Sequence, residues 1–146
     1  MIRKAIQSDK KTYVEMAREF YDSPAVAHQV PAAHFEKTFD EAMRSDAYVG
    51  LFLLTDGGEV CGYALTARTF TQEAGGIVVW LEELYLRPAH RSKGLGREFF
   101  AFMEREMPAA RYRLEVEPDN ERAKALYARL GYTILPYEQM YKDRTK

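Results

Sequence analysis

The feature that most constrains the fold is a run of three strand-like segments joined by tight turns. Two of them, Tyr48 to Leu54 and Val60 to Phe70, flank Asp56-Gly57-Gly58, and Gly75-Gly76 precedes a third, Ile77 to Leu86. Asp-Gly and Gly-Gly pairs favour the left-handed backbone of hairpin turns. We therefore expect an antiparallel meander in the middle of the chain.

Helical patterns precede this meander. A short strand is expected at Ile2 to Ala5, and Ser8 can cap a helix that follows it. The apolar face of this first helix is Tyr13, Met16, Ala17, Phe20 and Tyr21. Pro24 ends the helix, and a second one begins near Pro31. Its apolar face is Phe35, Phe39, Ala42 and Met43. Two helices thus separate the first strand from the meander.

After the meander the pattern alternates between helix and strand. We expect a helix from Gly94 to Met107, a strand from Arg111 to Glu117 and a helix from Asp119 to Leu130, capped by Asp119 and Gly131. Short strands are expected at Tyr132 to Leu135 and near Glu138 to Tyr141. The connection after Leu86 is long enough for a parallel crossover. The predicted fold class is therefore α/β, with a mixed, mostly antiparallel sheet of about six or seven strands and helices on both faces.

Composition limits the kinds of protein that this chain can be. At 146 residues it is most simply one domain, residues 1–146. Lys and Arg number 21 against 22 Asp and Glu, and a net charge of −1 argues against nucleic-acid or membrane partners. The single cysteine, Cys61, has no internal disulfide partner, and the N-terminal residues lack an apolar signal core. We therefore expect a cytoplasmic protein with Cys61 in its core.

The stretch Arg91-Ser92-Lys93-Gly94-Leu95-Gly96-Arg97 places three cations where a helix begins. A helix N-terminus already carries partial positive charge and unpaired N–H groups, so an anion should offset them. The two glycines let the backbone approach phosphate oxygens closely. A nucleotide P-loop would need Lys-Ser/Thr after Gly96, and a dinucleotide-binding loop would need a third glycine. The stretch therefore predicts an anion site of another kind, suited to a polyphosphate.

The same stretch fits a third pattern, Arg/Gln-x-x-Gly-x-Gly/Ala, after the strand Trp80 to Leu86. A second segment keeps the spacing of a strand–helix–strand motif through Leu114, Val116, Asn120, Ala123, Tyr127, Gly131 and Tyr132. Together the two segments resemble the GCN5-related N-acetyltransferase (GNAT) family. The resemblance is sharpest from Leu81 to Tyr132, and the order of the upstream elements agrees with it. It implies the GNAT fold and an acyltransferase enzyme.

The resemblance implies acetyl-coenzyme A (acetyl-CoA) as co-substrate. In the family, the loop amides hold the pyrophosphate, and the strand before the loop offers backbone hydrogen bonds to the pantetheine arm. The implied cofactor-binding residues are Leu84, Tyr85, Leu86, Arg91, Ser92, Lys93, Gly94, Leu95, Gly96, Arg97, Asn120 and Tyr127. The phosphates would then supply the missing negative charge for the three loop cations.

Acetyl transfer to an amine requires a neutral nitrogen. An alkylamine with a pKa near 10.4 is neutral in only about one molecule in 2,500 at pH 7, roughly 4.6 kcal/mol uphill, so a base is expected. Glu82 and Glu83 interrupt an apolar strand, and adjacent strand residues face opposite sides, so one of them should face the cleft. The resemblance favours Glu82 and keeps Glu83 in reserve. A β-bulge in this strand would reverse that parity.

The resemblance also implies that Tyr127 protonates the departing thiolate. Asn120 either hydrogen-bonds the pantetheine or caps its helix, and both interpretations stay open. A strand N–H near Leu84 is expected to stabilise the oxyanion. Transfer should be direct, in a ternary complex. No metal is expected, because the three histidines, His28, His34 and His90, lack the spacing of metal ligands.

The acceptor is expected in a groove walled by residues 21–30, the middle strands and residues 136–137. Carboxylates at Glu82, Glu83, Glu115 and Glu117 favour a small cationic amine, and the Leu-Glu-Glu segment is similar to that of diamine acetyltransferases. Three alternatives stay open: a noncatalytic acyl-CoA sensor, an acetyltransferase acting on a protein or peptide amine, and a plain phosphate-binding or interaction module. A homodimer is frequent in the family.

Overall fold

The computed structural model describes residues 1–26 and 28–144. The chain divides into two compact units, Met1–Glu115 and the residues from Val116 onward. We describe each unit by itself. The single domain expected for residues 1–146 stays a prediction.

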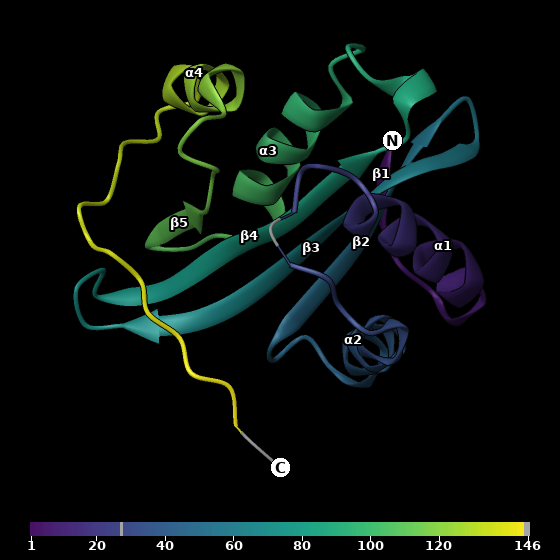
Figure 1. Ribbon diagram of the computed structural model, residues 1–146, viewed down its shortest axis with the longest axis horizontal. Coiled ribbons are helices and arrows are strands. Elements are labelled where there is room, and N and C mark those ends of the chain that lie inside the picture. The colour runs from purple at the N-terminus through teal and green to yellow at the C-terminus, as the bar shows by residue number, and fades with distance from the viewer. Residues whose placement is uncertain (27, 145–146) are drawn as a thin grey trace. The chain divides into compact units, whose positions relative to one another are not determined.

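The first unit is built on one five-stranded sheet, in the order β1-β2-β3-β4-β5 (Figure 1). Its strands are β1 (Ile2–Lys4), β2 (Val49–Asp56), β3 (Glu59–Thr71), β4 (Gly76–Leu86) and β5 (Arg111–Leu114). Neighbouring strands run antiparallel as far as β4, and β5 then pairs with β4 in parallel. The predicted meander and the parallel crossover are therefore confirmed.

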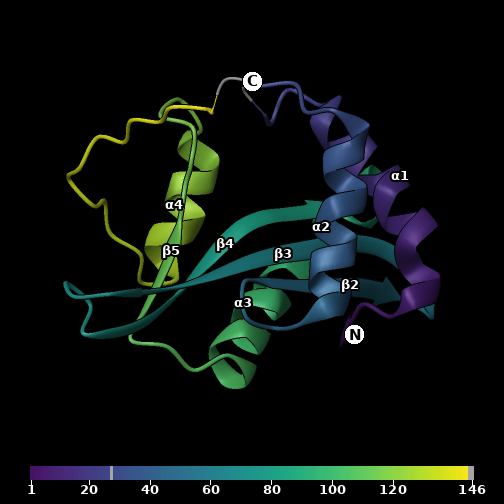
Figure 2. The same ribbon diagram turned by 90° about the horizontal axis from the view of Figure 1, so that it is seen from below.

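Helices cover both faces of this sheet, as the sequence predicts. The elements are η1 (Gln7–Asp9), α1 (Lys10–Tyr21), α2 (Ala32–Arg44), η2 (Pro88–His90) and α3 (Leu95–Glu106). Helices α1 and α2 lie together on one face, and α3 lies on the other (Figure 2). Successive β2 side chains show why: Leu51 and Leu53 pack under α1 and α2, whereas Phe52 contacts Phe99 of α3 at 5.8 Å between ring centroids.

The core of the first unit lies mainly between the sheet and helices α1 and α2. Tyr13 and Phe39 face each other there at 6.0 Å, and the Tyr13 ring meets the ring of Tyr63 edge-on at 5.1 Å. Cys61 is fully buried in β3, and burial raises the pKa of its thiol. The expectation that Cys61 is a core residue is therefore confirmed.

The number of strands differs from the prediction of six or seven. Strand β5 ends at Leu114 rather than Glu117, and residues 132–135 and 138–141 form no strand in the described chain. Apolar residues do occur in both segments, but Ile134, Met140 and Tyr141 are exposed. Apolar content alone does not make a strand, because a strand needs a neighbour for its backbone hydrogen bonds.

The helix caps also correct two predictions. Helix α1 begins after Asp9, while Ser8 lies within η1. In the second unit, α4 (Glu121–Arg129) is capped by Asn120, whose side-chain oxygen accepts a hydrogen bond from Ala123 N at 3.1 Å. Asn and Asp cap helices about equally well, so the local signal did not separate Asn120 from the preceding Asp119.

Candidate active site

Strand β4 has an open edge next to the predicted phosphate loop. Its pairing with β5 covers only four residues, Val78 to Leu81, and ends where Leu81 meets Leu114. On its other side β4 stays paired with β3 as far as Leu86, opposite Gly62. The main chain of residues 82–86 therefore has strand β3 on one side and, within the first unit, no paired strand on the other.

The loop that follows has the backbone geometry of an anion site. Gly94 is left-handed with φ 83°, and Ser92 is left-handed too with φ 64°. Ser92 is the only described non-glycine residue with a positive φ, a conformation that costs a side chain roughly 1–2 kcal/mol. The first helical bond of α3 runs from Glu98 N to Gly94 O at 3.0 Å. The N–H groups of residues 95–97 precede that bond and are unpaired within the helix.

The three loop cations have different surroundings. The Arg91 guanidinium donates from Nε to Leu86 O at 2.8 Å and lies 5.7 Å from the Tyr85 ring. Lys93 Nζ donates to Asp56 Oδ2 at 3.0 Å, and Arg97 is exposed. All three are at the surface beside the loop. Arg91, however, already uses one of the carbonyls expected to serve the pantetheine arm.

Asp56 is a residue that the sequence analysis did not assign to this site. It ends β2, and its Oδ2 lies 2.9 Å from His90 Nδ1 as well as 3.0 Å from Lys93 Nζ. The hydrogen bonds from His90 and then Lys93 hold the pKa of the Asp56 carboxyl below its usual range. Asp56 therefore ties the β2–β3 turn to both ends of the loop before α3. No local signal marks this role, since 34 and 37 residues separate the partners.

A bulge in β4 places the two candidate bases. Leu65 pairs with Glu83 and the next β3 residue, Thr66, pairs with Leu81, so Glu82 is the extra residue on β4. A bulge bends its strand and re-aims the side chains. The rule that adjacent strand residues face opposite sides therefore does not apply at Glu82 and Glu83. The sequence analysis named a bulge as the feature that would reverse this parity.

Glu83 lies on the α1 and α2 face, held by two phenols. Tyr21 OH at the end of α1 donates to Glu83 Oε2 at 2.5 Å, and Tyr63 OH on β3 donates to Oε1 at 2.7 Å. Burial raises the pKa of the Glu83 carboxyl, and the two hydrogen bonds oppose that rise. Burial and the nearby Glu83 charge also raise the pKa of both phenols. We call Tyr21, Tyr63 and Glu83 the tyrosine–carboxylate cluster.

Glu82 has a different environment. Its side chain is exposed at the bulge, and no donor in the described chain bonds its carboxylate. The surrounding chain nevertheless removes part of the water around the carboxyl. This partial desolvation, followed by the negative charges of Glu115 and Glu83, raises the pKa of the Glu82 carboxyl. A carboxyl with a raised pKa that is open to solvent is suited to taking up a proton near neutral pH.

A second carboxylate supports the same strand from α1. Glu19 accepts from Tyr85 OH at 2.9 Å and from Arg87 Nε at 3.2 Å. The positive charge of Arg87 balances that of the Glu19 carboxylate. We therefore assign Glu19 to holding the end of β4. Only the folded chain brings it there, because 66 residues separate Glu19 from Tyr85.

Asn120 and Tyr127 belong to the second unit. Asn120 acts as the cap of α4, which is one of the two roles left open for it. Tyr127 is half-buried, its ring lies 6.2 Å from that of Tyr132, and burial raises the pKa of its phenol. The implied roles of both residues toward the cofactor stay predictions.

The described residues contain neither a metal-ligand cluster nor a membrane-spanning helix. No group of three or more His, Cys, Asp or Glu side chains in residues 1–26 and 28–144 is arranged to hold a metal ion. Over the same part of the chain, no helix has the length and apolar character needed to cross a membrane.

A mixed α/β sheet whose strand edge leads into a glycine-containing loop and a helix N-terminus is an arrangement suited to holding phosphate groups. The comparison with known families then identifies the class more closely. Residues 12–132 match the acetyltransferase (GNAT) family, and the chain belongs to that family. The predicted family is confirmed, and an acyltransferase enzyme is supported.

Individual relatives agree with this membership. Mycothiol acetyltransferase of Streptomyces bingchenggensis (strain BCW-1) is 33% identical over 101 residues, which cover 66% of this chain and 31% of that protein. The chain thus spans about a third of that relative's length. Thialysine N-epsilon-acetyltransferase of Mus musculus is 28% identical over 146 residues, covering 89% of this chain and 82% of that protein.

The fold is shared with solved structures. One is AAC(6')-Iy in complex with the bisubstrate analog CoA-S-monomethyl-acetylneamine. It matches with a TM-score of 0.81 at 16% identity, covering 99% of this chain and 98% of that one. Identity this low supports the fold alone, and the predicted GNAT fold is confirmed.

Proposed function

We propose that the chain transfers the acetyl group of acetyl-CoA to a primary amine, directly, in a ternary complex. The acceptor is a small cationic amine. The observation that carries this proposal is the open edge of β4, which ends at Leu86 and leads into a loop with left-handed Ser92 and Gly94. Family membership supports the same reaction.

The residues present fit the proposed co-substrate. Unpaired N–H groups at the start of α3 suit a pyrophosphate, and the exposed cations Lys93 and Arg97 suit the remaining phosphate charge. The edge of residues 84–86 suits the amides of a pantetheine arm. The solved relative in complex with a CoA-containing analog is consistent with this assignment. Acetyl-CoA would supply the activated acetyl thioester.

The base in this proposal is Glu82, acting on the amine directly or through water. Its carboxylate is exposed, carries no protein hydrogen bond in the described chain, and has a raised pKa. Glu83 remains the reserve candidate. Because both of its oxygens already accept phenol hydrogen bonds, Glu83 is less available to take a proton from the amine, and we assign it to holding the cationic acceptor, whose charge would favour the ionised carboxylate. An ionised carboxylate lowers the cost of desolvating an ammonium group.

Tyr127 is proposed to protonate the departing thiolate, and Asn120 to help position the co-substrate. Both proposals rest on the family resemblance. A cationic acceptor is supported by Glu82 and Glu83 and by the thialysine acetyltransferase relative. The cytoplasmic location, the homodimer and the lack of nucleic-acid or membrane partners stay predictions.

The test measures thiol release from acetyl-CoA with diamines, polyamines, lysine analogues, aminoglycosides and peptides as acceptors. We expect turnover with small cationic amines. Glu82→Gln should lower kcat by about 10²-fold or more with little change in acetyl-CoA binding. Glu83→Gln should chiefly raise the acceptor KM. Glu59→Gln, an exposed glutamate at the start of β3, is the matched control.

Other outcomes would point elsewhere. Turnover with peptides alone would replace the small-amine acceptor by a protein amine. Stabilisation by acetyl-CoA without turnover on any amine would favour the noncatalytic sensor. Equal stabilisation by ATP, or none by any acyl-CoA, would contradict the acyl-CoA site itself.

A further inference from the structure

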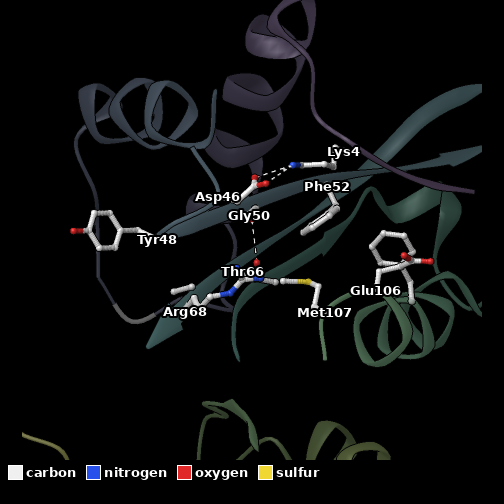
Figure 3. Close-up of a pocket in the computed structure, with 11 residues that line it drawn as sticks. Lys4, Asp46, Tyr48, Gly50, Phe52, Thr66, Arg68, Glu106 and Met107 are labelled. Carbon is white, nitrogen blue, oxygen red and sulfur yellow. Dashed lines mark hydrogen bonds and ion pairs between the residues drawn. The ribbon is translucent and has the colours of Figure 1, made fainter. Parts of the chain in front are cut away.

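A hollow of about 290 Å³ opens on the α3 face of the sheet (Figure 3). It lies between the ends of β2 and β3 and the C-terminal end of α3. Its lining residues are Lys4, Asp46, Tyr48, Gly50, Phe52, Thr66, Ala67, Arg68, Phe102, Glu106 and Met107. All of them belong to the first unit.

This hollow is separate from the candidate active site. Thr66 and Arg68 project from β3 on the α3 face, whereas Tyr63, which bonds Glu83, belongs to the core under α1 and α2. The sheet therefore lies between the hollow and the tyrosine–carboxylate cluster. The predicted phosphate loop begins α3, and the hollow is at its other end, about 18 Å away along 12 residues.

The walls of the hollow are aromatic and the floor depends on a glycine. Phe52 and Phe102 meet edge-on with ring centroids 5.3 Å apart, and Met107 is buried beside them. A Cβ on Gly50 would lie 2.5 Å from Thr66 Oγ1 and 3.0 Å from the Phe52 ring. Gly50 therefore lets Thr66 and Phe52 pack closely against the β2 backbone, and a larger residue there would displace them. An aromatic-lined space of this kind suits a flat apolar ring.

The charges around the hollow leave one cation without a counter-ion. Lys4 Nζ is paired with Asp46 at 2.7 Å, and Glu106 accepts from Arg105 at 3.0 Å. The Arg68 guanidinium has no acceptor or anionic partner among residues 1–26 and 28–144. An arginine fork beside aromatic walls matches a carboxylate carried by a ring.

We propose that this hollow binds a small aromatic carboxylate, with its ring packed against the Phe52–Phe102 pair and its carboxylate on Arg68. The volume sets the size of the ligand. It is near the lower end of the usual range of ligand pockets, about 300–1,000 Å³, and roughly twice a cavity of about 150 Å³ that holds benzene. One ring with a short acidic side chain fits. The site is independent of the acetyl-transfer function.

The test uses phenylacetate as the probe, with phenylacetamide and phenethylamine as neutral and cationic analogues. Binding is measured by isothermal titration and by ligand-observed NMR on the full chain, with and without saturating acetyl-CoA. We expect saturable binding of phenylacetate, weaker binding of the two analogues by about tenfold or more, and a dissociation constant that acetyl-CoA leaves unchanged.

Variants make the assignment specific to these residues. Arg68→Gln should weaken phenylacetate binding by about tenfold or more, because it removes the charge and keeps the length of the side chain. Gly50→Ala should weaken binding, because the added Cβ would push Thr66 and the Phe52 ring out of place. Arg18→Gln, which removes an arginine over the Phe35 ring on the opposite face, is the matched control and should bind like the parent.

Several results would overturn the proposal. They are equal affinity for the acid and the amide, unchanged affinity in folded Arg68→Gln, displacement of phenylacetate by acetyl-CoA, or no saturation by about 10 mM phenylacetate. Because the readout is binding and not turnover, failure of the acetyl-transfer function would leave this result unaffected.

Discussion

Glu83 on β4 is hydrogen-bonded by Tyr21 of α1 and Tyr63 of β3, and its pKa depends on these contacts. Tyr21 is 62 residues away in the chain and Tyr63 is 20 residues away. Buried carboxylates prefer to be neutral, while two phenol donors favour the ionised form. In this cluster burial is the larger effect, since the Glu83 pKa is raised overall.

A first prediction concerns the pH dependence of stability. The folded Glu83 carboxyl takes up its proton at a higher pH than the same group in the unfolded chain. Its stabilising contribution is therefore complete below the unfolded pKa, near 4.3, and is lost as pH rises through the raised folded pKa. The unfolding free energy of the parent, relative to Glu83→Gln, should fall over that interval.

Urea unfolding of both proteins at several pH values measures this difference. Tyr21→Phe removes one donor and keeps the ring, so it should raise the Glu83 pKa further and move the interval to higher pH. A difference between parent and Glu83→Gln that does not change with pH, or one that grows as pH rises, would contradict the burial of this carboxyl.

A second prediction at the residue scale concerns Asp56. Asp56→Asn removes the charge that holds Lys93 and His90 beside the loop. Because the ion pair is partly exposed, we expect a modest effect, about a two- to fivefold rise in the acetyl-CoA KM at unchanged kcat. Steady-state kinetics with varied acetyl-CoA measures it.

Asp40→Asn is the control for that measurement. Asp40 pairs with Lys10 at 2.8 Å between α2 and α1, and it is likewise exposed. It should leave the acetyl-CoA KM unchanged. If Asp56→Asn and Asp40→Asn behave alike, Asp56 does not position the loop.

At the scale of elements, the path of β4 is set by its close contact with β3. Gly62 lies opposite Leu86, and a Cβ built on Gly62 would overlap the Tyr85 carbonyl oxygen. Glu19 of α1 accepts two hydrogen bonds from Arg87, which follows Leu86, and so holds the same end of β4. The bulge at Glu82 and the early end of β5 then leave the other edge of β4 open.

A third prediction follows from that contact. Gly62→Ala should destabilise the protein by about 2 kcal/mol or more, because the overlapping atom belongs to the backbone and cannot turn away. It should also raise the acetyl-CoA KM by shifting residues 85 and 86. Thermal unfolding and kinetics test both effects. In the control Gly76→Ala, the new Cβ meets the Ala110 methyl at 3.1 Å, so a smaller loss of stability is expected.

Local signals predicted the elements of the first unit well and those after Leu114 less well. Alternation and glycine turns located β2, β3 and β4 to within two residues at each end. The strands predicted within residues 132–141 are absent from the described chain. The reason is that short turns connect each strand of the meander to the strand with which it pairs. The C-terminal residues are not connected by such a turn to a pairing strand.

At the scale of the whole molecule, the proposed function draws on both units. The loop before α3 lies in the first, while Asn120 and Tyr127 lie in the second. The family motif spans both, and the matched region runs from residue 12 to residue 132. The roles proposed for Asn120 and Tyr127 therefore need a test of their own.

A fourth prediction tests these two roles by hydrogen exchange. Saturating acetyl-CoA should slow exchange of the amides of residues 94–97 and, in the same titration, those at the start of α4 near Asn120. At a concentration of about 100 times the dissociation constant, it should add about 2.7 kcal/mol to the unfolding free energy. Protection confined to the first unit would remove Asn120 and Tyr127 from the proposed site.

The sequence by itself determined the antiparallel meander, the parallel crossover, the helices on both faces and the glycine-containing loop that begins α3. Each of these depends on residues close together in the chain, through side-chain periodicity, turn conformation and the exposed N–H groups of a helix start. Family membership followed from the same local spacing, because the motif residues lie within two short segments.

Only the tertiary structure decided the environment of each site residue. The bulge at Glu82, the phenols on Glu83, the Asp56 bridge and the hollow above Gly50 all depend on strand register and packing between distant residues. The sheet register is set when whole strands and helices bury their apolar faces together. A carboxylate's partners, and therefore its pKa and its chemistry, are a consequence of that assembly.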